Sequence, residues 1–170
     1  MKKALGYILF ATLMVGFMAC GSALSQKEGG AEKALRNGDY DRAVMEAVAG
    51  LRIDPASPKL VDILPRAFEA SINAHKNEIS RLKASEDPFS WEQIYTEYKQ
   101  LARVHRAVSE LPGLASIAPS IKVANYDREV RDARGQAANA HYKFGLLLIQ
   151  DMMREPNMKQ QRKAAHAFKR

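Results

Sequence analysis

The sequence reads GDYDRAV at residues 38–44 and LRIDP at residues 51–55, and these two stretches carry its clearest indication of fold. Asn37-Gly38 ends one helix, Asp39 is placed to cap the next, and Asp54-Pro55 stops it. Helices joined by such short turns lie antiparallel to each other. The sequence therefore predicts a short helix over residues 31–37 and a second helix over residues 39–53.

The rest of the chain shows the same helical pattern. Apolar residues recur every three or four positions from Leu60 to Leu82, after Ser57-Pro58, which is typical of a helix start. Further helices are predicted from Ser90 to about residue 108, over residues 123–153 and from about Lys159, with a connector over residues 111–119. No alternating β-branched pattern indicates a sheet. We predict an all-α fold of paired antiparallel helices.

The first hairpin resembles the tetratricopeptide repeat, a helix–turn–helix unit of about 34 residues. Its GDYDRAV stretch contributes Gly38 and Tyr40, and LRIDP contributes the closing proline. Small residues of the two helices fall in register with the family pattern. The residues that carry this resemblance are Ala31, Gly38, Tyr40, Ala43 and Pro55.

A second stretch, residues 141–168, is similar to the same repeat. Here His141 stands where the family has tryptophan, and a longer turn around residues 153–161 separates the two helices. The matching positions are Phe144, Gly145, Leu148, Ala164 and Phe168. The two matches cover about half of the chain that follows the signal segment described below.

The resemblance implies an α-solenoid of helical hairpins that binds extended or helical peptides in a groove lined by the first helices of each pair. The candidate groove residues are Tyr95, Tyr98 and Asn139. Residues 58–122 follow no repeat consensus, so a generic helical bundle remains the alternative. The chain stops inside its last predicted helix without a polar capping unit. We therefore expect the fold to be incomplete at Arg170, with residues 159–170 poorly packed.

Cys20 is the only cysteine, and it follows a typical export segment. Two lysines precede the uncharged apolar run Leu5–Met18, and Ala19 comes directly before the thiol. The stretch FMAC at residues 17–20 resembles the lipobox of bacterial lipoproteins, although leucine is usual at the position of Phe17. This resemblance implies cleavage before Cys20 and a covalent lipid on its thiol, with palmitate among the acyl chains.

Two other interpretations of this segment remain open. The apolar run could stay uncleaved as a membrane-spanning helix, or Gly21-Ser22-Ala23 could serve an ordinary signal peptidase. We expect a signal peptide over residues 1–19, a lipidated cysteine and flexible tether over residues 20–30, and a helical repeat domain over residues 31–170. Because Gly21 is not the aspartate that retains lipoproteins in the inner membrane of enteric bacteria, we expect anchoring at the outer membrane, facing the periplasm.

The charge of the chain argues against nucleic-acid binding. Removing residues 1–19 takes away two lysines and leaves 24 basic and 19 acidic residues, a net charge of +5. Five basic residues within positions 159–170 account for that whole excess. The remainder is neutral, and no basic stripe is interleaved with aromatic residues.

The sequence contains no recognisable catalytic or metal-binding pattern. The four histidines fall on different predicted helices, and no HExxH, GxSxG or phosphate-cradling glycine pattern occurs. Glu92 and Glu97 lie more than one helical turn apart, which is a poor arrangement for a general acid and base. We therefore expect no enzymatic activity, no metal and no cofactor other than the lipid on Cys20.

The sequence as a whole predicts a lipid-anchored envelope protein that binds a protein or peptide partner through helical repeats. The alternatives are a lipoprotein that captures a ligand or saccharide for nutrient uptake and a purely structural envelope bundle.

Overall fold

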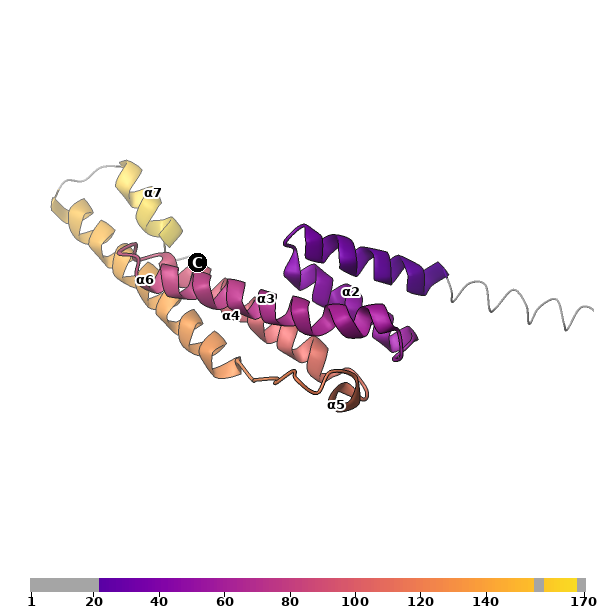
Figure 1. Cartoon of the computed structure of the whole chain (residues 1–170). Helices are drawn as coiled ribbons and strands as arrows, with labels where there is room; N and C mark the ends of the chain where they lie inside the picture. The colour runs from indigo at the N-terminus through magenta and orange to yellow at the C-terminus, as the bar shows by residue number, and fades with distance from the viewer. Residues whose placement is uncertain (1–21, 155–157, 168–170) are drawn as a thin grey trace, which may run out of the picture. The chain divides into compact units, whose positions relative to one another are not determined.

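The computed structural model describes residues 22–154 and 158–167, and within these ranges every regular element is a helix. The predicted all-α class is therefore confirmed. A helix over residues 22–36 comes first (Figure 1). The helices that follow are α2 (Tyr40–Ile53), α3 (Pro58–Lys83), α4 (Ser90–Ser109), α5 (Leu114–Ile117), α6 (Asp127–Arg154) and α7 (Met158–Ala167).

The helix over residues 22–36 corrects the prediction of a flexible tether up to residue 30. Gly29 and Gly30, which are adjacent in this helix, lower its helix propensity, although most of its other residues are good helix formers. Contacts with distant parts of the chain compensate. Lys27 Nζ lies 2.9 Å from Glu46 Oε2, and Ser57 Oγ donates a hydrogen bond of 2.7 Å to Glu28 Oε1. Tertiary contacts thus help to stabilise residues 22–30, the part of this helix that was not predicted.

The described chain divides into two compact units. Unit 1 comprises the described residues up to Ile72 together with residues 104–123, and unit 2 comprises residues 73–103 and those from Ala124 onward. Both α3 and α4 contribute residues to each unit. The sequence analysis predicted one helical domain over residues 31–170, so this division was not foreseen.

Unit 1 begins with a hairpin formed by helix 22–36 and α2. Gly38 adopts a φ of +76°, and its N–H donates to the carbonyl of Leu35 while the N–H of Asp39 donates to that of Ala34. This pair of bonds is a Schellman turn, which requires the left-handed conformation that glycine adopts freely. Asp39 then caps α2 by accepting a hydrogen bond from the N–H of Arg42. The predicted turn and cap are confirmed.

The core of unit 1 consists of small and branched side chains. Ala31 of the first helix and Ala43 of α2 are completely buried, so their helices approach closely. The predicted apolar face of α3 supplies the next layer, and the ring of Phe68 meets His105 edge to face at 4.9 Å. The largest fully buried side chains of this core are Val44, Leu51, Leu60, Leu64, Val104 and Val108.

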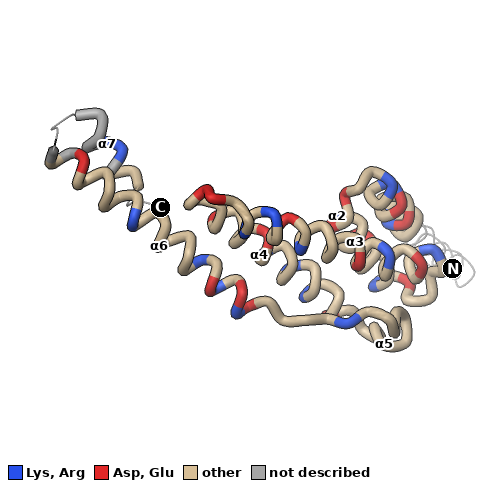
Figure 2. The backbone as a smooth tube through the Cα atoms, turned by 60° about the vertical axis from the view of Figure 1, so that its left-hand side comes forward, with Lys and Arg blue, Asp and Glu red and all other residues tan. Residues whose placement is uncertain are grey.

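Unit 2 is held by contacts among the remaining parts of α3 and α4 and the later helices. His75 Nδ1 lies 2.6 Å from Glu97 Oε2, which joins α3 to α4. Ile94 and Leu101 of α4 are fully buried, and α6 contributes the buried Ala133. Charged residues of both signs interleave along α3 and α4, with no block of one sign (Figure 2).

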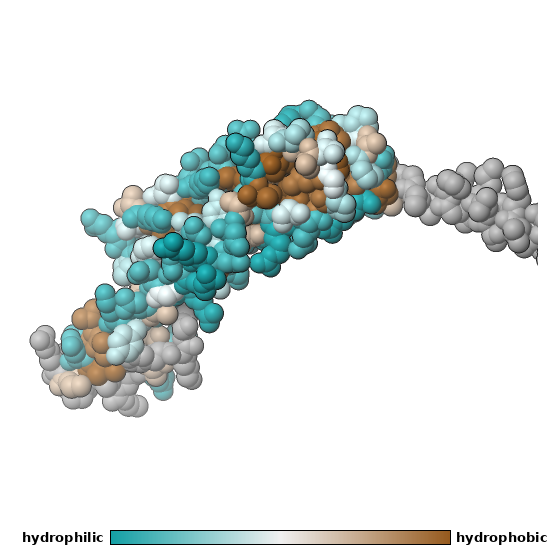
Figure 3. All heavy atoms as spheres, turned by 90° about the horizontal axis from the view of Figure 1, so that it is seen from below, coloured by the Kyte–Doolittle hydropathy of each residue, from teal (hydrophilic) through white to brown (hydrophobic). Residues whose placement is uncertain are grey.

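The C-terminal helices differ from expectation in three respects. The long helix begins at Asp127 rather than near residue 123, and the predicted connector contains the one-turn helix α5. In addition, α7 contacts α6 (Figure 1) and Ala167 is buried, which differs from the poor packing expected over residues 159–170. The other described side chains of this range are exposed, as expected; they are Arg162, Lys163, Ala165 and His166. The surface of α6 carries several apolar side chains. Part of that surface stays exposed near the end of α6 (Figure 3), including Leu147 and Met153.

Candidate functional site

Unit 1 contains a pocket of about 460 Å³ between helix 22–36 and α3, which we call the charged pocket. Three of its residues come from helix 22–36, four come from the first turns of α3, and Tyr40 comes from the start of α2. Leu35 and Ile63 belong to the hydrophobic core, so the pocket has an apolar floor. The lining residues are Glu32, Leu35, Arg36, Tyr40, Lys59, Asp62, Ile63 and Arg66.

The charges of this pocket are organised around Glu32. Its carboxylate lies 2.5 Å from Lys59 Nζ on α3 and 2.6 Å from Arg36 Nη1 on its own helix. The hydrogen bond and positive charge of Lys59, followed by the charge of Arg36, hold the pKa of Glu32 below its usual value. A second pair, Arg66 with Asp62, lies along α3 at 2.8 Å. The pocket therefore presents both signs of charge above an apolar floor.

The two helices that line the charged pocket, helix 22–36 and α3, both approach α2 closely at Gly50. Gly50 of α2 leaves so little space that an added Cβ would lie 2.3 Å from Leu60 Cδ1 and 3.1 Å from Lys27 Cβ. Helix 22–36, α2 and α3 therefore meet closely at this one residue. The sequence analysis did not single out Gly50, because a close approach of distant helices leaves no local pattern.

The predicted repeat-packing residues of the first hairpin occupy core, turn and pocket positions. Ala31 and Ala43 are buried, and Gly38 makes the turn. Tyr40 lines the charged pocket, while Pro55 is exposed in the turn between α2 and α3.

The predicted repeat-packing residues of the second repeat-like segment, residues 141–168, differ from one another in burial. Gly145 is buried within α6 and Leu148 is half-buried, whereas Phe144 is 37% exposed. Ala164 lies in α7, but its side chain is outside the described set. Phe168 and the predicted lipidation residue Cys20 both lie outside the described residues.

The structure places two of the predicted groove residues on α4 and one on α6. Tyr98 accepts a hydrogen bond of 3.1 Å from Lys83 Nζ, and its ring lies 6.2 Å from that of Tyr126. Tyr95 lies under Lys99 Nζ, and Asn139 is exposed on α6. None of the predicted three lines the charged pocket or the cavity of unit 2 described next.

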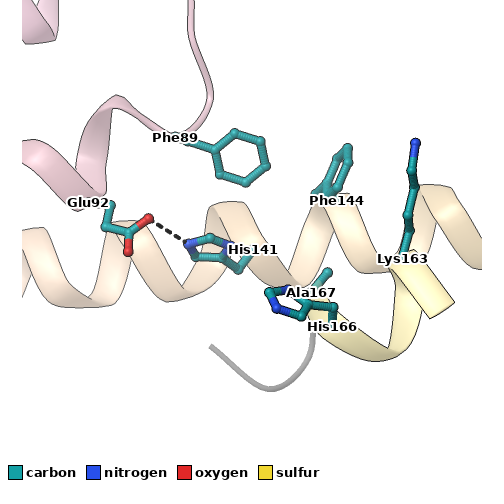
Figure 4. A pocket seen from close by; sticks show the side chains of 7 residues that line it. All are labelled: Phe89, Glu92, His141, Phe144, Lys163, His166 and Ala167. Atoms are coloured by element: carbon teal, nitrogen blue, oxygen red, sulfur yellow. Dashed lines mark ion pairs between the residues drawn. The ribbon is translucent and has the colours of Figure 1, made fainter.

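Unit 2 contains a second cavity of about 430 Å³, which we call the aromatic cavity (Figure 4). Phe89 and Glu92 approach from the start of α4, and the other lining residues come from α6 and α7. Glu92 Oε2 lies 3.3 Å from His141 Nε2. The lining residues are Phe89, Glu92, His141, Phe144, Lys163, His166 and Ala167.

Two of the histidines contact glutamates that lie far from them in the sequence. Glu97 pairs with His75, and Glu92 pairs with His141. Each pair joins two helices of unit 2. Across residues 22–154 and 158–167, no group of three or more histidine, cysteine, aspartate or glutamate side chains is arranged to hold a metal ion.

Comparison with family models, with curated proteins and with solved structures finds no match for this chain. Within the described part of the chain, none of the helices combines the length and apolar character that crossing a membrane requires.

Proposed function

We propose that this protein is a lipid-anchored component of a bacterial cell envelope that binds a peptide segment of another envelope protein. Binding takes place in the charged pocket, between helix 22–36 and α3. The lipid is carried by Cys20, and the membrane is the outer membrane, with the protein facing the periplasm. The protein acts as a scaffold rather than as an enzyme.

The observation that carries this proposal is the combination of charges and apolar surface in the charged pocket. Leu35 and Ile63 offer contact to an apolar side chain. Arg36, Asp62 and Arg66 are already in ion pairs within the pocket, but they are largely exposed and could exchange these partners for charged groups of a ligand. A peptide supplies such a mixture at spacings of a few ångströms, together with its backbone donors and acceptors. A nucleic acid would instead call for positive charge throughout.

The tetratricopeptide-like features of unit 1 also support the binding of a peptide in the charged pocket. The pocket lies between helix 22–36 and α3, which are the first helices of successive pairs if unit 1 is read as a repeat array. Peptide ligands of such repeats bind between helices at these positions. The close packing at Ala31 and Ala43 and the proline after α2 agree with this interpretation.

Site-specific photo-crosslinking in the native host tests the proposal. A photoreactive amino acid at position 62 should give one discrete adduct with an envelope protein. The same amino acid at Arg42, which is exposed on α2 and outside the pocket, is the matched control and should give no such adduct.

The charge reversals Arg36→Glu and Arg66→Glu, made together, should abolish the adduct formed from position 62. Both side chains are largely exposed, so the fold should be retained. Arg42→Glu should leave the adduct unchanged. Equal adducts from positions 62 and 42 would contradict binding in the pocket, and no adduct from either position would favour a purely structural role.

A further inference from the structure

We propose that the aromatic cavity of unit 2 binds a small carboxylate with an apolar, aromatic body. This site is separate from the charged pocket and would give the protein a ligand-binding activity that does not depend on peptide binding. The inference rests on the shape of the cavity, the arrangement of its rings and the charge that is left without a partner.

The cavity is built to accept an apolar ring. Phe89 and Phe144 meet edge to face, with centroids 5.2 Å apart and planes at 83°. The ring of His141 lies 5.0 Å from that of Phe89, so the three rings line one continuous wall (Figure 4). A volume of about 430 Å³ falls in the range of cavities that hold small organic ligands.

The cavity carries a cation that no described residue neutralises. Glu92 Oε2 and His141 Nε2 contact each other at 3.3 Å, which places a polar pair beside the rings. Lys163, by contrast, has no ion pair or hydrogen bond with a described residue. It extends on the same side as Phe144, whereas the ring of His166 lies farther along α7, on the side of His141 (Figure 4). Lys163 is therefore the group of the described lining that is available to an anionic ligand.

This pattern selects a monoanion with an apolar body. A carboxylate could accept a charge-assisted hydrogen bond from Lys163 while its ring contacts Phe89 and Phe144. A cation of the same shape would be repelled by Lys163. A phosphate monoester carries about two negative charges, for which one lysine and one imidazole are a poor match in a wall made mostly of rings. The residues 158–167 contain no acidic side chain that would compete for Lys163.

Three matched probes test the proposal by calorimetric titration of the whole protein. They are 2-naphthylacetate, the corresponding naphthyl alcohol and the corresponding naphthyl amine, which share a ring and differ in charge. We expect the acid to bind about five- to tenfold more tightly than the alcohol, because it adds one partly exposed charge-assisted hydrogen bond. The amine should bind more weakly than both.

Two variants distinguish the contribution of the Lys163 charge to binding from that of the aromatic rings. Lys163→Met keeps the apolar stem of the side chain and should reduce the affinity for the acid to that for the alcohol. Phe89→Ala should reduce the affinities for the acid and for the alcohol by a similar factor, because both ligands lose contact with the phenyl ring. Arg162→Met is the control, since Arg162 is the neighbouring exposed cation and does not line the cavity.

The proposal is overturned if the acid shows no binding at millimolar concentration or if all three probes bind equally. It is also overturned if Lys163→Met leaves the preference for the acid intact. An equal loss in Arg162→Met and Lys163→Met would show diffuse attraction to the basic helix rather than a site. Circular dichroism of each variant verifies that the helices are retained.

Discussion

Replacing Gly50 by alanine tests whether unit 1 depends on the close approach of its helices. Gly50 lies inside α2, where glycine is normally unfavourable, so alanine at an open position would stabilise the helix by about 0.5–1 kcal/mol. Here the added methyl group would lie 2.3 Å from Leu60 Cδ1 and 3.1 Å from Lys27 Cβ. Ordinary carbon contacts are about 3.5–4.0 Å, so Leu60 would have to move by more than about 1 Å.

Leu60 has little room for such a movement because it is completely buried. Inserting a methyl group into a packed core typically costs about 1–3 kcal/mol. After subtracting the gain in helix propensity, we expect Gly50→Ala to lower the free energy of unfolding by about 1 kcal/mol. Combining it with Leu60→Val should cost less than the sum of the two single changes, because valine vacates the contested space.

Gly29→Ala is the matched control, since Gly29 also lies within a helix of unit 1 but an added Cβ would meet nothing within 4 Å. It should raise the free energy of unfolding by about 0.5–1 kcal/mol. Urea unfolding followed by circular dichroism measures both variants, and similar slopes would show that the unfolded states are comparable. If both alanine variants stabilise the protein equally, the close approach at Gly50 is not real.

Three further changes address other parts of the chain. Cys20→Ser should abolish lipid labelling and leave the precursor uncleaved or the domain soluble; mature-length protein that still fractionates with membranes would contradict the lipoprotein hypothesis. Gly145→Leu should destabilise unit 2 by about 1–3 kcal/mol, because Gly145 is buried in α6, and a variant that melts at a higher temperature would refute the predicted helix crossing. Burial, followed by the charges of Glu129 and Tyr98, raises the pKa of Tyr126 above 10.0. Since the unfolded phenol ionises first, stability should fall as the pH rises above 10 through the folded-state pKa, and Tyr126→Phe should reduce this fall in alkaline unfolding experiments.

Much of the helix pattern could be predicted because its signals are local. Ser57 accepts a hydrogen bond from the N–H of Leu60 at the start of α3, where Ser57-Pro58 indicated a helix start. The apolar spacing along α3 and α4 placed Leu64 and Ile94 correctly in the interior. A hydrophobic face repeats every three or four residues, so it is visible in the sequence itself.

The candidate sites could not be predicted because their residues meet only after folding. Lys59 reaches Glu32 from 27 positions away, and His141 reaches Glu92 from an even greater separation. The aromatic residues chosen from the sequence, Tyr95 and Tyr98, instead contact lysines. No spacing rule connects such pairs, since their distance depends on how whole helices pack.

The helical conformation of residues 22–36 limits how far from the membrane the charged pocket of a lipidated protein could lie. A flexible segment of ten residues could extend by up to about 35 Å, whereas two residues span about 7 Å. With Cys20 in the membrane as proposed, Arg36 lies at most about 30 Å along the chain from the lipid, because a helix rises only about 1.5 Å per residue. The charged pocket would then stay close to the bilayer. The rate at which it meets a partner protein would depend on lateral diffusion in the membrane plane rather than on the length of a flexible tether.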